Sequence, residues 1–117
     1  MVESKSKDLV LKFVERINAR DADGLAELMT EDFTFVDYEG GGYAGRDDGR
    51  DNFAKYFELY PEYKIHVSEV LRSGKDIAIL GTTTGSHVAA EVEADEVVLW
   101  VAEVEGDLVS SWRIYAM

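Results

Sequence analysis

Residues 33–43 read Phe33-Thr-Phe-Val-Asp37-Tyr-Glu-Gly-Gly-Gly-Tyr43, an alternating apolar segment with one acidic residue just before a run of glycines. Side chains alternate along a strand with period two, so Phe33, Phe35 and Asp37 should share one face, turned toward an apolar interior. A carboxylate at the end of such a row can accept a proton near neutral pH. Alternatively, Asp37 is a turn residue that begins the glycine loop.

Three segments around this strand have helical patterns. Apolar residues at helical spacing predict a first helix over residues 6–19. Asp21 is a suitable N-cap for a short second helix. Aromatic residues spaced i, i+3, i+4 and i+7 predict a third helix over residues 48–60, and Pro61 marks its end.

The rest of the chain has strand patterns. Residues 63–68 alternate between apolar and polar side chains, and further strands are predicted over residues 77–87, 97–105 and 108–116. The order of helix, helix, strand, helix and several antiparallel strands predicts an α+β domain with its helices on one side of a bent sheet. We expect one such domain over residues 1–117.

Composition and charge exclude several classes of function. The chain has no cysteine, so disulfides, thiolate catalysis and cysteine-ligated zinc are excluded. A net charge of −12 repels phosphate backbones, and we expect neither nucleic acid nor membrane as a partner. The N-terminus lacks the apolar core of a signal peptide, so a cytoplasmic location is expected.

The segment 97–102, Val-Val-Leu-Trp-Val-Ala, is apolar on both of its faces. Three helices can cover only one face of the sheet, so the other face should need a partner surface. We expect a homodimer that packs through the outer sheet face. The alternative is a central strand beside an ordinary exposed apolar patch.

Four segments together resemble the nuclear transport factor 2-like superfamily and, within it, the SnoaL-like and ketosteroid-isomerase-like branch. They are residues 13–29, 30–37, 49–57 and 104–115. The resemblance implies a cone-shaped curved antiparallel sheet wrapped around three N-terminal helices, a cystatin-like α+β roll with an apolar pocket. Its members include isomerases, dehydratases and cyclases, so the fold leaves the function open.

The same resemblance implies a role for Asp37. It occupies the place of the general-base aspartate of ketosteroid isomerases, whose oxyanion hole is a tyrosine and a protonated aspartate. Phe13 and Trp100 stand at those two positions, and neither can stabilise an enolate in the same way, so ketosteroid isomerisation proper is disfavoured. The aspartate that SnoaL-like cyclases carry after the last strand is absent, because the sequence ends Tyr115-Ala-Met117.

Other residues are candidates for ligand binding. Tyr56 aligns with a pocket-lining aromatic of the family, although a plain core aromatic is the alternative. Arg113 and Tyr115 share one strand face, which could be turned inward to the ligand or outward to solvent or a dimer partner. His87 resembles a histidine near the family's pocket mouth, whereas His66 should be solvated. Two histidines without metal-ligand spacing predict no metal site, and no cofactor is expected.

These observations predict a pocket for a small apolar metabolite. In this pocket, Asp37 would transfer a proton as in an isomerase, dehydratase or cyclase. The expected ligand-binding residues are Phe13, Phe35, Tyr56, Trp100, Arg113 and Tyr115. The alternatives are a binding module without chemistry and a dimeric structural domain. An enzyme would need a second polar group that faces Asp37.

Overall fold

The computed structural model describes residues 2–37, 40–74 and 76–116, which form four helices and six strands. The helices are α1 (Val2–Asn18), α2 (Ala22–Glu27), α3 (Arg46–Leu59) and α4 (Ala90–Glu93). The strands are β1 (Met29–Val36), β2 (Gly42–Ala44), β3 (Lys64–Ser73), β4 (Asp76–Thr84), β5 (Val98–Glu105) and β6 (Leu108–Ala116).

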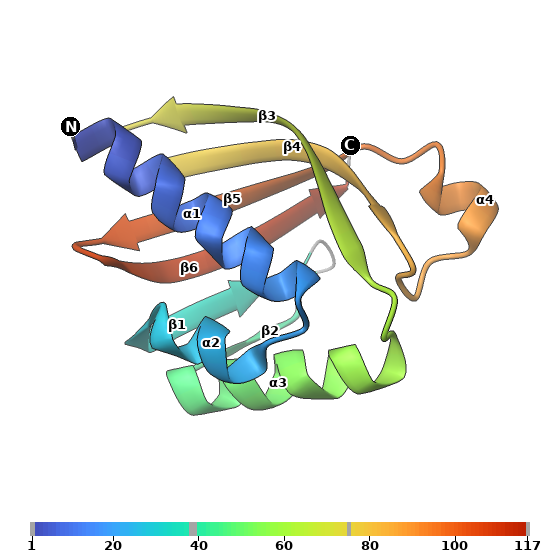
Figure 1. Ribbon diagram of the computed structural model, residues 1–117, viewed down its shortest axis with the longest axis horizontal. Coiled ribbons are helices and arrows are strands. Elements are labelled where there is room, and N and C mark those ends of the chain that lie inside the picture. Colours follow the sequence, from blue (N-terminus) through green and yellow to red (C-terminus); the bar gives the residue numbers. More distant parts are fainter. Residues whose placement is uncertain (1, 38–39, 75, 117) are drawn as a thin grey trace.

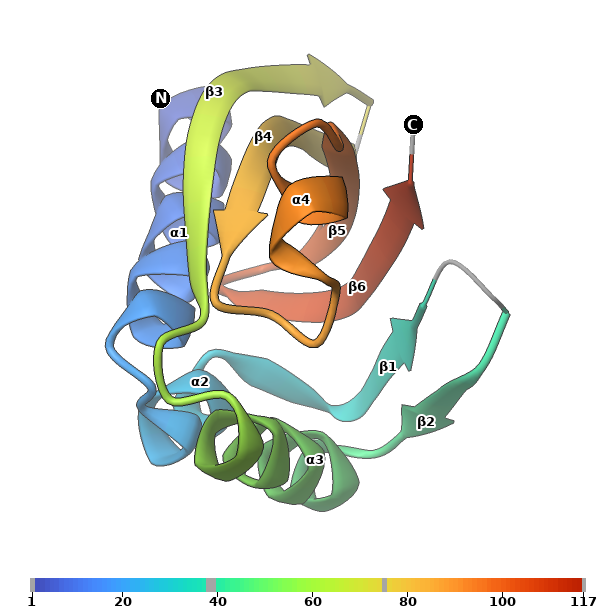
Figure 2. The ribbon, with the colours of Figure 1, turned by 90° about the vertical axis from the view of Figure 1, so that its right-hand side faces the viewer.

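The strands form one curved sheet in the order β2-β1-β6-β5-β4-β3 (Figure 1). Neighbouring strands are antiparallel except β1 and β6, which are parallel. The sheet bends around α1 and α3, which lie on its concave side (Figure 2). The predicted α+β class and curved sheet are therefore confirmed, with the correction that one strand pair is parallel.

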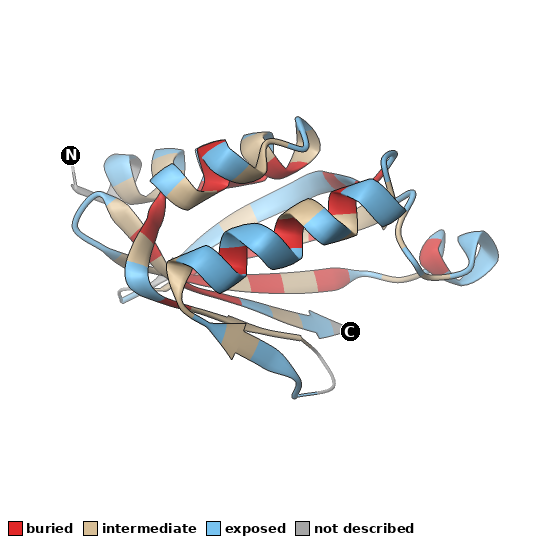
Figure 3. Ribbon diagram, turned by 90° about the horizontal axis from the view of Figure 1, so that it is seen from below, coloured by how far each residue is buried: buried red, intermediate tan, exposed pale blue. Residues whose placement is uncertain are grey.

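The two long helices bury one side each against the sheet. α1 contacts β3, β4 and β6, whereas α3 contacts β1 and β2. Buried positions recur along one side of both helices (Figure 3). As predicted, Asp21 caps α2, because its Oδ1 accepts a hydrogen bond from the backbone N–H of Gly24 at 2.9 Å.

Phe13 lies in the centre of the core and is fully buried. Its ring centroid is 6.1 Å from that of Phe33, 6.1 Å from that of Phe53 and 4.8 Å from that of Trp112. This aromatic cluster joins α1 to α3, β1 and β6, so Phe13 is a packing residue that fixes the helices against the sheet.

The element bounds differ from prediction in several places: α1 begins at residue 2 and not at 6, β3 continues to residue 73, β4 ends at residue 84 and not at 87, and α4 was not predicted. Gly42 begins β2, a strand that the sequence analysis did not anticipate, and it pairs with Val36 of β1. A side chain at residue 42 would collide with the backbone carbonyl of Phe35, so glycine allows the two strands to approach. The alternating pattern predicts a strand over residues 33–38, and the last of these, Tyr38, lies outside the described residues.

Candidate functional site

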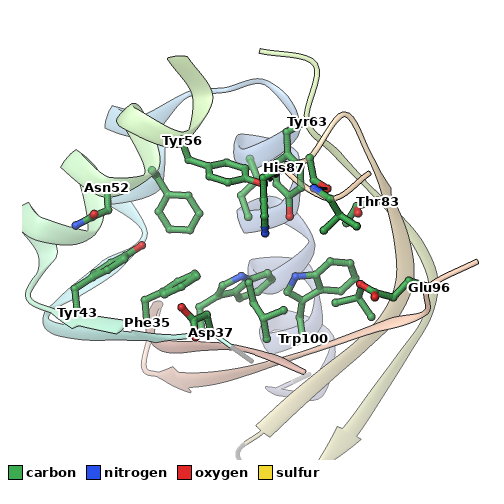
Figure 4. A pocket seen from close by; sticks show the side chains of 17 residues that line it. Phe35, Asp37, Tyr43, Asn52, Tyr56, Tyr63, Thr83, His87, Glu96 and Trp100 are labelled. Carbon is green, nitrogen blue, oxygen red and sulfur yellow. Dashed lines mark hydrogen bonds between the residues drawn. The ribbon is translucent and has the colours of Figure 1, made fainter. Parts of the chain in front are cut away.

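A cavity of about 510 Å³ opens between α3, the inner face of the sheet and the segment that follows β4 (Figure 4). Aromatic side chains are the largest group among the described lining residues: Phe35, Tyr43, Phe53, Tyr56, Tyr63, Trp100 and Trp112. Its polar side chains are Asp37, Asn52, Thr83, Ser86, His87 and Glu96. A largely apolar cavity with a few polar groups is the usual form of a small-molecule site.

Asp37 lies at the end of β1, is half-buried and lines this cavity. Its backbone N–H donates to the carbonyl oxygen of Gly41 at 2.8 Å, and its Oδ1 accepts from the backbone N–H of Gly41 at 2.9 Å. Asp37 therefore begins the glycine turn, as the second interpretation predicted, and it also lines the cavity. Its role as a proton acceptor stays a prediction.

Tyr56 and His87 form a hydrogen-bonded pair at the rim of the cavity. The Tyr56 hydroxyl oxygen is 2.9 Å from Nδ1 of His87 and accepts the backbone N–H of His87 at 3.3 Å. One arrangement that satisfies both bonds has the hydroxyl donating its single proton to Nδ1 while it accepts the backbone N–H, and in a neutral imidazole this arrangement places the ring proton on Nε2. The His87 ring then presents Nε2–H to the cavity (Figure 4).

Burial raises the pKa of Tyr56, and it raises those of Tyr43 and Tyr63 as well. The three tyrosines line the cavity and keep their hydroxyl protons near pH 7, so that of Tyr56 can be donated to His87.

Glu93 on α4 anchors the segment that closes one end of the cavity. Its Oε2 accepts the hydroxyl proton of Thr83 at 2.7 Å and the backbone N–H of Ser86 at 3.2 Å. Burial alone would raise the pKa of Glu93, but hydrogen bonds from Ser86 and Thr83 outweigh it, so its pKa is lowered. The carboxylate thus ties α4 to β4.

Trp100 is 1% exposed and lines the cavity from the inner face of β5. Phe35 also lines the cavity, and its ring stacks on that of Tyr43 with the centroids 4.8 Å apart. Phe13, in contrast, lies behind Trp112 in the core and does not reach the cavity. Its expected contact with ligand is therefore corrected.

Arg113 and Tyr115 lie on the outer face of β6, because they alternate with Trp112 and Ile114, which line the cavity. Arg113 is exposed, and its Nη2 is 3.8 Å from Oε2 of Glu103. Of the two orientations considered for this face, the outward one is found, so the expectation that both residues contact a ligand in the cavity is corrected. His66 is exposed as expected, and its Nε2 is 2.9 Å from Oγ1 of Thr84.

Sequence reasoning missed Tyr43, Asn52, Glu93 and Glu96. Asn52 precedes Tyr56 by one helical turn, so helical spacing could have placed it on the same side of α3. Tyr43 of β2 pairs with Phe35 of β1, and a strand as short as β2 has no sequence periodicity from which this pairing could be predicted. Glu93 and Glu96 belong to an acidic stretch that resembles an ordinary solvated surface.

The described residues bear on two kinds of site, for a metal ion and for a membrane. No cluster of three or more histidine or acidic side chains is arranged to hold a metal ion there. In the same part of the chain, no helix has the length and apolar character needed to span a membrane.

Similar folds occur in solved structures from several bacteria. A nuclear transport factor 2-like protein of unknown function from Cytophaga hutchinsonii is 18% identical, with 96% of this chain and 89% of that chain covered at a TM-score of 0.78. A cystatin-fold protein from Novosphingobium aromaticivorans is 20% identical, with 93% of this chain and 96% of that chain covered at a TM-score of 0.79. These TM-scores show that the two proteins share the fold of this chain.

A third structure, from Catenulispora acidiphila, has a ketosteroid-isomerase-like fold and contains trimethylamine. It is 17% identical, with 92% of this chain and 83% of that chain covered at a TM-score of 0.75. No match was found among curated protein sequences.

The sequence itself carries the family assignment. A family model of the SnoaL-like domain matches residues 10–112, a region that includes the helices α2, α3 and α4, most of α1, and nearly all of the sheet. The chain therefore belongs to the SnoaL-like domain family.

Proposed function

We propose that the protein binds a small, largely apolar metabolite in the aromatic cavity and transfers a proton on it, with Asp37 as the general base. The observation that carries this proposal is the position of Asp37, which lines a largely apolar cavity of about 510 Å³. Cyclase and isomerase chemistry both depend on such a transfer, and similar folds occur in proteins named for each activity.

The reaction that fits this arrangement is removal of a proton from a carbon next to a carbonyl group. The electrons of the broken C–H bond move toward the carbonyl oxygen, and the proton passes to the Asp37 carboxylate. Return of the proton to another atom gives an isomer, and expulsion of a leaving group gives an elimination product. Positioned carboxylates of this kind accelerate proton transfer by about 10²–10⁴-fold.

A second polar group supports a reaction over simple binding. Across the cavity from Asp37, the Tyr56–His87 pair presents a fixed imidazole at the rim (Figure 4). A neutral Nε2–H can donate to an oxygen on which negative charge develops. The chain therefore offers a base on one wall and a hydrogen-bond donor at the opposite rim, which a binding module would not require.

Deuterium exchange tests the proposal. 2-Tetralone is a compact bicyclic ketone with exchangeable C–H bonds beside its carbonyl group. The wild-type protein should accelerate incorporation of deuterium from D₂O above the buffer rate, whereas Asp37→Asn should bind the ketone without accelerating exchange. Binding by the wild-type protein with no acceleration would favour the non-catalytic alternative.

We also propose that the chain forms a homodimer through the outer sheet face. Leu80, Leu99 and Tyr115 form one cross-strand row on this face, and Ala78 and Val101 lie in the next. Tyr115 is 42% exposed, and all four of these residues from β4 and β5 are half-buried. A second copy would cover these side chains.

A further inference from the structure

The indole N–H of Trp100 is a buried hydrogen-bond donor that has no acceptor among the described residues. Two other buried side-chain oxygens in that part of the chain are also without a partner, those of Thr30 and Ser111, but neither residue lines the cavity. Buried donors are normally paired, because an unpaired one loses its bond to water without replacement. The Trp100 N–H therefore needs an acceptor other than the described residues, and a ligand in the cavity that Trp100 lines could supply one.

The strand holds this donor in place. Trp100 is in the middle of β5, where it pairs with Ile79 of β4 on one side and Ile114 of β6 on the other. With 1% of its surface exposed, the ring cannot turn toward solvent. In Figure 4, the nitrogen edge of the Trp100 ring lies among the other side chains that line the cavity.

The charges of the cavity select the kind of acceptor. Asp37 and Glu96 both line it, and the described lining residues include no lysine or arginine. A carboxylate or phosphate would face two carboxylates without a compensating cation, which costs free energy in a partly apolar site. An uncharged oxygen on an apolar skeleton satisfies the indole N–H and adds no charge.

We propose that Trp100 Nε1–H donates a hydrogen bond to the carbonyl oxygen of an uncharged, largely apolar ketone or aldehyde, and that this bond defines the ligand class. The inference rests on the proposed function for the identity of the site, and it adds the group that the site recognises. The same bond strengthens when Asp37 removes a neighbouring proton, because the oxygen then gains negative charge.

Two probes of nearly the same shape test the bond directly. 2-Tetralone has a carbonyl oxygen, and tetralin is the corresponding hydrocarbon. The chain has only two tryptophans, so the ¹H–¹⁵N spectrum contains two indole signals, which either Trp100→Phe or Trp112→Phe assigns. In the wild-type protein, 2-tetralone should shift the Trp100 indole proton downfield, and tetralin should not.

Affinities provide the second measurement. The wild-type protein should bind 2-tetralone on the order of tenfold more tightly than tetralin. Trp100→Phe should remove that preference with little change in tetralin affinity, whereas Trp112→Phe, a matched loss of an indole from the same wall, should keep it. The spectrum needs no variant that alters Trp100, so it remains decisive if Trp100→Phe does not fold.

Three results would overturn the inference: equal indole shifts with both probes, a ketone preference that survives in Trp100→Phe, or no binding of either probe at millimolar concentration. Failure of the proposed proton transfer is separate. A ketone-specific indole shift without accelerated deuterium exchange would leave the carbonyl site intact and remove the catalytic role of Asp37.

Discussion

The Tyr56 hydroxyl oxygen lies 2.9 Å from Nδ1 of His87, and this hydrogen bond joins α3 to the segment that follows β4. The two residues are 31 positions apart in the sequence. Their contact fixes the imidazole at the rim of the cavity, and with the hydroxyl as donor it places the ring proton on Nε2.

Removal of the Tyr56 hydroxyl should allow the His87 imidazole to exchange between its two neutral tautomers. In the wild-type protein, long-range ¹H–¹⁵N spectra should show a neutral imidazole protonated on Nε2. Tyr56→Phe removes the donor to Nδ1, so the Nδ1 signal should move toward the value of a free, exchanging imidazole. Tyr60→Phe removes a hydroxyl from a neighbouring ring and should leave the His87 signals in place. An unchanged spectrum in Tyr56→Phe would refute the tautomer assignment.

Glu93→Gln should destabilise the protein by about 1–3 kcal/mol, because the charged acceptor of the Thr83 and Ser86 bonds is lost. The lowered pKa of folded Glu93 means that its contribution is present above the unfolded pKa of about 4.3 and is lost as the pH falls through the folded value. Urea denaturation at pH 7 and pH 3 should show that the difference between the variant and wild type shrinks in acid.

Glu91→Gln is the matched control for this change, since Glu91 is exposed on the same short helix. It should alter the free energy of unfolding by no more than about 0.5 kcal/mol. Equal effects of the two substitutions would show that Glu93 does not anchor α4 to β4.

The buried tyrosines should make the protein sensitive to alkali. Burial raises the folded pKa of Tyr43, Tyr56 and Tyr63, whereas tyrosine in the unfolded chain titrates near pH 10. Above that pH the folded state holds more protons than the unfolded state, so the free energy of unfolding should fall by about 1.4 kcal/mol per pH unit for each of the two strongly shifted tyrosines, Tyr43 and Tyr63. Tyr63→Phe should reduce this slope by one tyrosine's share between pH 10 and pH 11.5, and an unchanged slope would contradict the assignment for Tyr63.

A charge in the middle of the outer sheet face should dissociate the proposed homodimer. Val101→Asp places a carboxylate on that face beside Ala78 and Arg113. Sedimentation velocity at micromolar concentration should give a dimer for the wild-type protein and a monomer for Val101→Asp. Val92→Asp alters an apolar residue that is 52% exposed on α4, and it should remain dimeric. A monomeric wild-type protein would exclude the homodimer.

The sequence predicted the elements that have strong periodicity. Helix α1, the Asp21 cap of α2, helix α3 and the long strands all follow from apolar spacing or capping chemistry. Strand β2 and helix α4 did not, because three and four residues are too few to establish a period. The parallel pairing of β1 with β6 is determined by tertiary packing, and no local sequence pattern predicts it.

The cavity was only partly predictable for a related reason. Phe35, Asp37, Tyr56 and Trp100 line it as the resemblance implied. For Arg113 and Tyr115, the alternation of β6 fixed that they share a face but not which face is inward. That orientation depends on how the sheet curves over α1 and α3, which is a property of the packed molecule.

Deuterium exchange into 2-tetralone, compared among three proteins, tests the central claim most directly. The wild-type protein and Asp32→Asn, which alters an exposed aspartate of the same strand, should accelerate exchange equally. Asp37→Asn should lose at least about a hundredfold of that acceleration, since a positioned general base is removed. Equal exchange by wild type and Asp37→Asn would contradict the account.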